Sequence, residues 1–490
     1  MDGLQILEII KKINPWFKTG VVPEPKLESF RRREFTYLEK DLDRLDMATL
    51  LIGARRVGKS VLMYQLIDKL LTSGIDGRRV LFIQGDNPVL NEIVGGGNLI
   101  NYVLDLYQKY IIDTSFDELI DTTYILIDEA QNISGWETQI KSLIDQKYKI
   151  KFIVTGSSSF ELRRGAENPL TGRVSIQSIF PFSFADYSRY QLSPEEQTKF
   201  ETKINDYSEK FKDGLTSGNL ESTYEVAKQA NTLIDEYDLE EKFEKYLFFG
   251  GFPWVISNVD GNDHTKYLRD LLTTTISKDI MNQVGIREPQ SFERLMVNLC
   301  LMAGSVIKYK TLSDALGIEE RTVAKYIDYY TESHWAFVSS PYVFHAKLDS
   351  VKTEKKVYII DSAVINTLSF KDESDFKSDR TYRGHIVENV IHNHLLAFKQ
   401  LKIGTFQSSI PFWIESNSGR EIDFIFEIKN GVVPIEIKQK ISHDRTDAEV
   451  VKDFLDKRSS AKFGIVTTQD TLEMDDKVLF IPNTLLAMLL

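Results

Sequence analysis

The stretch Thr49-Leu50-Leu51-Ile52-Gly53-Ala54-Arg55-Arg56-Val57-Gly58-Lys59-Ser60 decides the fold of the first part of the chain. Residues 50–52 are apolar, the last eight residues match the phosphate-binding loop pattern, and a helix-forming stretch, 61–71, follows. We expect the backbone N–H groups of residues 53–60 to surround phosphate oxygens, because glycines let the chain close around them. Lys59 is expected to reach the β and γ phosphates of a nucleotide, and Ser60 to bind Mg²⁺.

A second apolar run ends in two carboxylates. Tyr124-Ile125-Leu126-Ile127 directly precedes Asp128 and Glu129, so both acids are expected at the carboxyl end of a strand. Beside a phosphate-binding loop, this position suits a Mg²⁺ ligand and a group that polarises the attacking water. We therefore predict that Asp128 lies near the Mg²⁺ and that Glu129 acts on the water. The alternative is a buried strand followed by solvated acids.

Five β-rich runs alternate with helical patterns and predict an α/β fold with a parallel sheet. The runs are Thr49–Ile52, Val80–Gln84, Tyr124–Ile127, Lys151–Thr155 and Val174–Ile179. The fourth run is followed by a serine-rich segment, in which Ser157 and Ser158 are candidates to bind the γ-phosphate or the water. A serine-rich turn without this function is the alternative.

Arg173 is the candidate for neutralising charge in the transition state of phosphate transfer. It could act within its own chain or on a neighbouring copy, which would require a homo-oligomer. Arg163 and Arg164 compete for the same function.

Composition excludes several classes of protein. The 490 residues include 60 Lys plus Arg and 72 Asp plus Glu, for a net charge of −12, and 42% are hydrophobic, as in a folded globular protein. No apolar run approaches the ~20 residues of a membrane-spanning helix. Cys300 is the only cysteine, which excludes an intrachain disulfide and fits a reducing cytoplasm. Residues 191–245 hold 14 acidic and 7 basic residues and so carry much of the negative charge. The negative net charge gives no positive evidence for nucleic acid binding.

The quoted motifs together resemble the AAA ATPase domain of a large archaeal and bacterial family. Ile127-Asp128-Glu129-Ala130, Thr155-Gly156-Ser157-Ser158 and Leu170-Thr171-Gly172-Arg173 join the phosphate loop in this likeness. Members of that family carry a further C-terminal domain of partly unknown function. The matching stretches are Gly250-Gly251-Phe252-Pro253, Lys356-Val357-Tyr358 with Asp361, and Glu421-Ile422-Asp423 with Ile435-Glu436-Ile437-Lys438. The resemblance covers nearly the whole chain after about Glu34, and it implies ATP and Mg²⁺ as cofactors and DNA as a partner.

A hairpin is predicted near the C-terminus because Asn430-Gly431 is a strong two-residue turn signal. With this turn at the tip, Asp423 would face Lys438, and Glu436 would lie on the same side one pair along. The hairpin resembles the PD-(D/E)XK nuclease core, where two carboxylates bind Mg²⁺ and a lysine assists. Glu388 is then the candidate for an additional metal ligand. The alternative is an ordinary hairpin with an Asp423/Lys438 ion pair.

Residues 311–333 predict a helix, a turn at Gly317 and a longer helix, followed by extended segments at 336–343 and 356–360. This is a winged helix-turn-helix pattern. Its second helix opens with two glutamates, which would oppose DNA phosphates. Lys347, Lys352, Lys355 and Lys356 form a basic stretch expected to serve as the wing. A protein-packing module is the alternative to a DNA reader.

These observations predict five regions. They are an N-terminal helical segment at 1–46, an ATPase core at 47–190, an acidic helical region at 191–300, a winged helix at 301–370 and a nuclease-like α/β domain at 371–490. The leading interpretation is a Mg²⁺-dependent ATPase whose nucleotide cycle moves the C-terminal domains, acting on DNA. The alternatives are an ATP-gated nuclease and an ATP-dependent switch that binds a protein partner. No membrane contact is expected.

Overall fold

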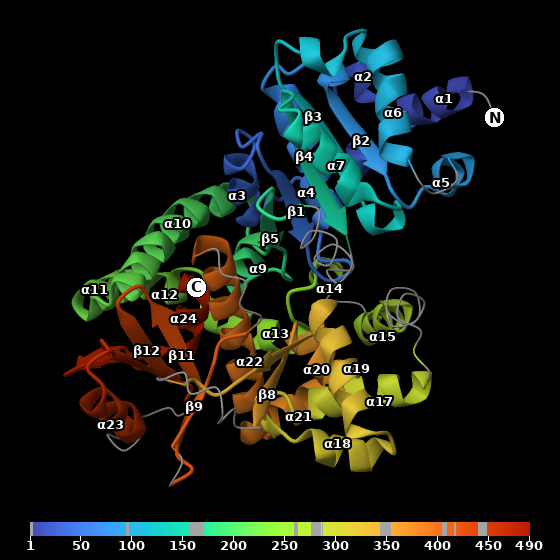
Figure 1. Cartoon of the computed structure of the whole chain (residues 1–490). Coiled ribbons are helices and arrows are strands. Elements are labelled where there is room, and N and C mark those ends of the chain that lie inside the picture. Colours follow the sequence, from blue (N-terminus) through green and yellow to red (C-terminus); the bar gives the residue numbers. More distant parts are fainter. Residues whose placement is uncertain are drawn as a thin grey trace. The chain divides into compact units, whose positions relative to one another are not determined.

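The computed structural model describes residues 3–94, 98–156, 170–258, 263–275, 286, 288–343, 354–403, 409–415, 418–439 and 448–490. The chain divides into two compact units, Met1–Ile179 and Phe180–Leu490, which we call the N-terminal unit and the C-terminal unit (Figure 1). The finer predicted division into five regions stays a prediction. None of the helices in the described part of the chain is long and apolar enough to cross a membrane.

A five-stranded parallel sheet forms the centre of the N-terminal unit. Its strand order is β2-β3-β4-β1-β5, and every neighbouring pair is parallel. The prediction of an α/β fold with this sheet is confirmed, and each strand lies within one residue of its predicted run. The strands are β1 (Ala48–Ile52), β2 (Val80–Gln84), β3 (Thr123–Asp128), β4 (Ile150–Gly156) and β5 (Val174–Ser178).

Helices connect and cover these strands because parallel neighbours need long crossover connections. β1, β2 and β4 are almost wholly buried, which explains why their sequences are continuous apolar runs rather than alternating ones. The helices are α1 (Gly3–Ile13), α2 (Trp16–Thr19), α3 (Glu34–Lys40), α4 (Lys59–Thr72), α5 (Pro88–Val94), α6 (Leu99–Tyr107) and α7 (Trp136–Asp145).

The turn after β1 depends on a glycine. Gly53 has a φ of 154°, and a Cβ atom there would overlap the carbonyl oxygen of Ile179. Any other residue would push the loop away from the end of the sheet. α4 then begins at Lys59, directly after Gly58. The start of α4 is therefore fixed beside the carboxyl end of β1.

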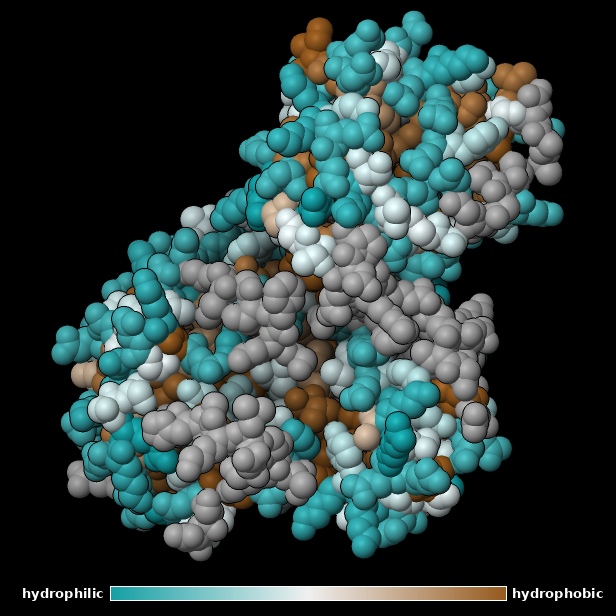
Figure 2. All heavy atoms as spheres, viewed as in Figure 1, coloured by the Kyte–Doolittle hydropathy of each residue, from teal (hydrophilic) through white to brown (hydrophobic). Residues whose placement is uncertain are grey.

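The face of the N-terminal unit drawn in Figure 2 is covered mainly by hydrophilic residues. The strand residues Leu50, Ile125 and Ile153 are fully buried beneath it. Burial of these residues supplies the main favourable free energy of this unit, since apolar area removed from water contributes roughly 25 cal/mol per Å².

The acidic segment forms helices of the C-terminal unit. α10 (Pro194–Ser217) and α11 (Leu220–Ala230) pack against each other and against α24 (Asn483–Leu489). The Ser208 hydroxyl donates to the carbonyl oxygen of Leu489 at 2.8 Å. α12 (Thr232–Glu236) and α13 (Leu239–Phe249) follow. The acidic residues are thus the solvent face of helices that help to build the core.

Two helices and a three-stranded sheet follow in the middle of this unit. α18 (Tyr309–Leu316) ends at Gly317, and α19 (Glu320–Glu332) comes after it, as predicted. The sheet has the order β6-β8-β7, with β6 (Val306–Ile307), β7 (Ala336–Ser339) and β8 (Lys355–Ile359) all antiparallel. β8 is the central strand, and all of its residues except Lys355 are buried.

A second five-stranded sheet has the order β11-β12-β13-β15-β14. Its strands are β11 (Phe424–Ile428), β12 (Gly431–Glu436), β13 (Gly464–Thr468), β14 (Glu473–Asp475) and β15 (Val478–Pro482), and β9 (Trp413–Ile414) pairs separately with β10 (Glu421–Ile422). The remaining helices are α9 (Phe184–Tyr190), α14 (Pro253–Ser257), α15 (His264–Thr274), α17 (Pro289–Leu301), α20 (Ser362–Leu368), α21 (Glu373–Ser378), α22 (Arg380–Phe398) and α23 (Glu449–Lys457).

The predicted register of the β11–β12 hairpin is wrong. Ile428 pairs with Gly431, so the turn is Lys429-Asn430 rather than Asn430-Gly431. A Cβ atom on Gly431 would overlap the carbonyl oxygen of Ser460, so this glycine allows a close backbone approach and does not form the turn. In the observed register, position 423 lies across from 436 and not from 438. Each side chain still lies on the predicted face of the hairpin, because the observed register differs from the predicted one by two positions and side chains alternate with a period of two.

The glycine pair before α14 has a structural function. The N–H of Gly251 donates to Asp361 Oδ2 at 2.7 Å, and the N–H of Ala363 donates to Asp361 Oδ1 at 2.9 Å. A Cβ atom on Gly250 would overlap the Asp361 carboxylate. Burial raises the pKa of Asp361 to about 6, although both N–H groups favour the ionised form. These motif residues therefore join α13–α14 to the start of α20.

Candidate functional site

The phosphate-binding loop holds Lys59 in the N-terminal unit. Lys59 is the first residue of α4 and is buried, and its Nζ donates to the carbonyl oxygens of Gly53 and Ala54 at 2.9 and 2.8 Å. Both acceptors are neutral backbone groups. The ammonium charge is thus held within the loop, next to the helix N-terminus, where anions are favoured.

Asp128 lies next to Ser60, as the sequence predicts for two ligands of one Mg²⁺. The Ser60 hydroxyl donates to Asp128 Oδ2 at 2.8 Å. Thr155, at the end of β4, donates to Asp128 Oδ1. Burial raises the pKa of Asp128, against the two hydroxyl donors, which lower it. A buried carboxylate whose hydrogen-bond donors are hydroxyls is suited to a divalent cation.

Thr155 is a residue of this site that sequence reasoning missed. Its hydroxyl also accepts a hydrogen bond from the backbone N–H of Glu129 at 3.3 Å. β4 lies between β1 and β3 in the sheet, so its last residues lie between the phosphate loop and Asp128. A polar residue at the tip of a neighbouring strand was the available signal. The predicted candidate, Ser157, lies outside the described residues, as do its competitor Ser158 and the two arginines at 163 and 164.

Glu129 is held in an uncommon backbone conformation. Its φ is 52°, in the left-handed region that residues other than glycine rarely adopt. The side-chain amide of Gln131 donates to Glu129 Oε2. The carboxylate is therefore oriented by a neighbour two residues along the chain, which is the kind of positioning that a general base requires.

A buried ion pair supports the phosphate loop from outside the predicted motif. Arg32 donates to both carboxylate oxygens of Glu34 at 2.8 Å and to the carbonyl oxygen of Val57 at 2.8 Å. Both side chains are buried. Val57 belongs to the loop, so this pair fixes the loop backbone. The sequence gives no spacing signal for a contact across 25 residues.

Arg173 lies at the amino end of the parallel strands, whereas the phosphate loop lies at their carboxyl end. Its carbonyl oxygen accepts from the N–H of Ala48, the first residue of β1, whereas the loop follows the last residue of β1. Five strand residues span about 15 Å. The guanidinium is ion-paired with Asp145. This placement is an argument for action of Arg173 on a neighbouring copy, and its action within its own chain or on a neighbour stays a prediction.

A cleft in the C-terminal unit collects the predicted carboxylates. It has a volume of about 710 Å³, and Glu388, Asp423, Glu436 and Lys438 are among its lining residues. Lys438 Nζ donates to Glu436 Oε1 at 2.6 Å. The N–H of Ile437 donates to Asp423 Oδ2 at 2.9 Å. The structure thus brings together all four residues, although the predicted Asp423/Lys438 pairing is replaced by Glu436/Lys438.

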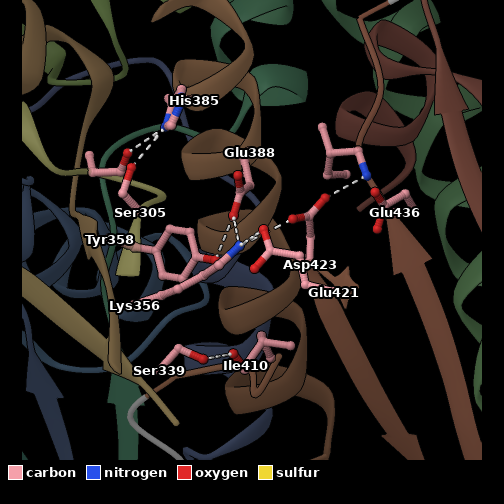
Figure 3. Close-up of polar contacts among 12 residues, drawn as sticks. Ser305, Ser339, Lys356, Tyr358, His385, Glu388, Ile410, Glu421, Asp423 and Glu436 are labelled. Atoms are coloured by element: carbon pink, nitrogen blue, oxygen red, sulfur yellow. Dashed lines mark hydrogen bonds and ion pairs between the residues drawn. The ribbon is translucent and has the colours of Figure 1, made fainter. Parts of the chain in front are cut away.

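A buried lysine joins two of these carboxylates. Figure 3 shows Lys356, on β8, pointing between Glu388 and Asp423. Its Nζ lies 3.1 Å from Glu388 Oε1, 3.2 Å from Asp423 Oδ1 and 3.4 Å from Glu421 Oε1. The Tyr358 hydroxyl donates to Glu388 Oε1 at 2.8 Å. The prediction that Lys356 belongs to an exposed basic wing is wrong, because the residue is only 1% exposed. Of the other predicted wing residues, 347 and 352 lie outside the described residues.

The charges in the cleft shift each other's protonation. Burial, together with the charge of Asp423, raises the pKa of Glu388 to about 8 and that of Glu436 to about 8. Burial opposes the charge on Lys356, but Asp423, Glu388 and Glu421 outweigh it and raise the pKa of Lys356 above its ordinary value. Lys356 therefore stays an ammonium ion.

The cleft carboxylates do not surround one metal position. Within the described ranges, no three His, Cys, Asp or Glu side chains are grouped so that they could hold a metal ion. In Figure 3 the Lys356 ammonium lies between Glu388 and Asp423, and it is ion-paired with both. The predicted metal site of Glu388, Asp423 and Glu436 is thus present as residues but is not preorganised.

Comparison with protein families identifies one known domain type. Residues 46–188 match the model of an AAA domain. Residues 240–375 and 383–486 match two families that are each described as a domain of unknown function. Residues 46–188 are therefore similar to an AAA domain, and the matches to the C-terminal unit carry no functional description.

Two uncharacterized proteins match most of the chain. An uncharacterized protein of Methanocaldococcus jannaschii is 22% identical, with 87% of this chain and 84% of the relative covered. An uncharacterized protein of Haemophilus influenzae is 21% identical, with 83% and 87% covered. Among solved structures, the Walker-type ATPase PABY2304 of Pyrococcus abyssi is 17% identical, covers 69% of this chain and 95% of its own, and has a TM-score of 0.37.

Proposed function

We propose that this chain, whose residues 46–188 match the model of an AAA domain, hydrolyses ATP with Mg²⁺ in its N-terminal unit. The observation that carries the proposal is the 2.8 Å hydrogen bond between Ser60 and Asp128, since it brings two oxygen ligands together at the start of α4. These oxygens would hold Mg²⁺, which supplies charge to stabilise the transferred phosphoryl group. The loop N–H groups and Lys59 would bind the phosphates.

Glu129 would act as the general base in this reaction. Its carboxylate takes a proton from the attacking water, while Gln131 and the backbone bond to Thr155 hold it in position. Arg32 keeps the loop backbone in place through Val57 and does not contact the nucleotide. Binding, proton transfer and positioning are thus assigned to different residues.

Turnover of ATP by the purified full chain tests this proposal. Glu129→Gln should lower turnover by about 10²- to 10³-fold and leave the ATP dissociation constant within about twofold, because only the proton acceptor is lost. Glu118→Gln, an exposed acid of the same unit, is the matched control and should leave both values unchanged. Wild-type turnover in Glu129→Gln would disprove the assignment of the base.

We further propose that the nucleotide cycle moves the C-terminal unit and that DNA is the substrate. The support is the helix-turn-helix of α18 and α19 beside a three-stranded sheet, a winged-helix arrangement. α19 offers Arg321 and Lys325 as cations for phosphates. Measurement of ATP turnover with and without duplex DNA tests this idea. Unchanged turnover at every DNA concentration would favour a protein partner and a binding switch.

The cleft supports a second candidate function, metal-dependent cleavage of DNA. The favouring observation is that Asp423 and Glu436 line one cleft, with Lys438 bonded to Glu436. Asp423→Asn should abolish cleavage in Mg²⁺ or Mn²⁺ and leave ATP turnover within twofold, because the two sites belong to separate compact units. If no duplex, branched or single-stranded DNA is cut in any nucleotide state, the cleft is a recognition site.

A further inference from the structure

Phe370 has a backbone conformation that suits glycine. The residue follows the end of α20, where Ser369 is the C-cap, and its φ is 55°. The N–H of Lys371 donates to the carbonyl oxygen of Asn366 at 3.1 Å, which closes the helix end as a Schellman motif does. Glycine is the usual residue at this left-handed position, because a side chain there strains the backbone. Folding alone therefore does not explain a phenylalanine at position 370.

The side chain of Phe370 is also poorly placed for stability. It is 73% exposed, although an apolar ring stabilises a fold only when its area is removed from water. Residues held in uncommon backbone conformations are concentrated at binding and active sites. Strain and exposure at the same residue would both be offset by a ligand that covers the ring. Phe370 is thus a candidate for a binding residue.

The ring lines a small pocket between α15 and α20, two helices that pack against each other (Figure 1). The pocket has a volume of about 210 Å³, and Phe248, Ala363 and Asn366 are among its other lining residues. The Asn366 side chain donates to the carbonyl oxygens of Leu247 and Phe248 at 3.1 and 2.8 Å, so this wall is already fixed. Pockets for drug-sized ligands usually measure about 300–1,000 Å³. This pocket is therefore suited to a single flat ring.

Two cations lie at the rim of the pocket. The guanidinium of Arg269 lies 4.9 Å from the centre of the Phe370 ring, and it makes no ion pair within the described part of the chain. The Nζ of Lys371 is 3.8 Å from Asp379 Oδ2, and both side chains are partly exposed, so this ion pair is weak. Asp372, an acid of the lining, accepts from two backbone N–H groups at the start of α21. Positive charge thus remains available to an anionic ligand.

We propose that this pocket binds one unpaired base of single-stranded DNA, which stacks on Phe370 while Arg269 and Lys371 contact the adjacent phosphates. The inference rests on the proposed action on DNA. Aromatic side chains bind bases of any sequence, because every base has a π face. A base inside a duplex is stacked between its neighbours and does not offer that face. A protein side chain would also fit the pocket, but the cations favour a strand that carries a phosphate at every nucleotide.

Binding of a fluorescein-labelled oligothymidylate of about 16 nucleotides to the full chain tests the proposal, measured by fluorescence anisotropy without ATP. Phe370→Gly removes the ring and suits the left-handed backbone. It should raise the dissociation constant about five- to a hundredfold, the effect of one lost stacking contact. Its melting temperature should equal that of the wild type or exceed it, because strain is removed. Leu301→Ala, at an exposed apolar residue of the same unit, is the matched control and should bind normally.

A strand of the same length that lacks bases separates stacking from charge. The wild type and Phe370→Gly should bind this abasic strand equally, because it has no base to stack. Arg269→Gln should weaken the binding of both strands and reduce the salt dependence of the dissociation constant, since its contact is with phosphate.

Three results would overturn the proposal. They are equal dissociation constants of the wild type and Phe370→Gly for oligothymidylate, an equal loss with the abasic strand, and failure of the wild type to bind oligothymidylate, which would leave Phe370 as a contact for a protein. Binding that depends on Phe370, while no DNA changes ATP turnover, would support the inference and contradict the proposed coupling. Turnover stimulated by duplex DNA, with no binding of the single strand, would do the reverse.

Discussion

The two carboxylate sites of this molecule are neutralised in different ways. In the N-terminal unit, Asp128 accepts hydrogen bonds from the hydroxyls of Ser60 and Thr155, and Lys59 donates to backbone carbonyls. In the C-terminal unit, Asp423 and Glu388 accept from the ammonium of Lys356. At the first site the hydrogen-bond donors described for the acid are hydroxyls, whereas at the second site the donor is an ammonium.

This difference indicates which site is prepared for a charged ligand. Hydroxyl and carbonyl partners orient a charge without cancelling it, as the proposed binding of Mg²⁺ by Asp128 and of phosphate by Lys59 requires. A buried lysine between carboxylates cancels their charge before any ligand arrives. The sequence motifs alone, each with acids and a lysine, do not reveal this contrast.

Removal of Lys59 gives the largest expected effect and tests whether its charge is kept for a ligand. Lys59→Ala should raise the ATP dissociation constant at least about a hundredfold, because the phosphate charge is no longer met. The measurement is isothermal titration calorimetry. Lys69→Ala, at the other end of α4 and ion-paired with Glu39, should bind ATP normally. An unchanged ATP dissociation constant in Lys59→Ala would contradict the difference described between Lys59 and Lys356.

Removal of one hydroxyl at each site sharpens the comparison. Ser60→Ala should raise the Mg²⁺ concentration needed for half-maximal ATP turnover about tenfold, since a metal ligand is lost. Tyr358→Phe removes a hydroxyl that donates to Glu388, and it should only lower the free energy of unfolding, by about 1.5 kcal/mol. Magnesium titrations and denaturant unfolding measure the two effects. An altered Mg²⁺ requirement in Tyr358→Phe would contradict this assignment.

The stability of the C-terminal unit should depend on pH through Glu436. Its pKa is raised from 4.5 to about 8 on folding, so the folded chain keeps a proton that the unfolded chain releases. The resulting stability is present below pH 4.5 and is lost as the pH rises toward 8. In thermal unfolding between pH 5 and 8.5, the wild type should lose about 3 °C more than Glu436→Gln. Parallel curves for the two proteins would show that Glu436 ionises normally.

Arg173→Ala should have the smallest effect in an isolated chain. Its ion pair with Asp145 is partly exposed and contributes at most about 1 kcal/mol. ATP turnover at low protein concentration should therefore change less than twofold. A large loss in Arg173→Ala that is restored by mixing with Lys59→Ala chains would instead show that the arginine serves a neighbouring copy.

The N-terminal sheet and its phosphate site could be predicted because their signals are local. An apolar run followed by eight loop residues specifies both a strand end and the start of α4, and Asp128 directly follows its own strand. Ser60 and Asp128 meet because parallel strands present their carboxyl ends at one edge. Thr155 was missed as a site residue although it ends the next predicted run.

The C-terminal cleft was predicted only in part because its decisive contact is not local. Lys356 and Asp423 are 67 residues apart and come from different sheets, so no spacing rule connects them. The hairpin register failed for a related reason. Gly431 was taken for a turn residue, but it is required by the backbone of Ser460, which approaches from elsewhere in the chain. Both errors arose because the contacts that matter join segments that are far apart in the sequence.

The packing of α10 against α24 can form only late in the synthesis of the chain. α10 ends at Ser217, and its partner helix begins at Asn483, so the ribosome must add some 260 residues between them. At roughly 5–20 residues per second, this interval is on the order of tens of seconds. Until then α10 can pack against α11, but the hydrogen bond between Ser208 and Leu489 cannot form. The C-terminal unit is therefore expected to complete its fold only after α24 has been synthesised.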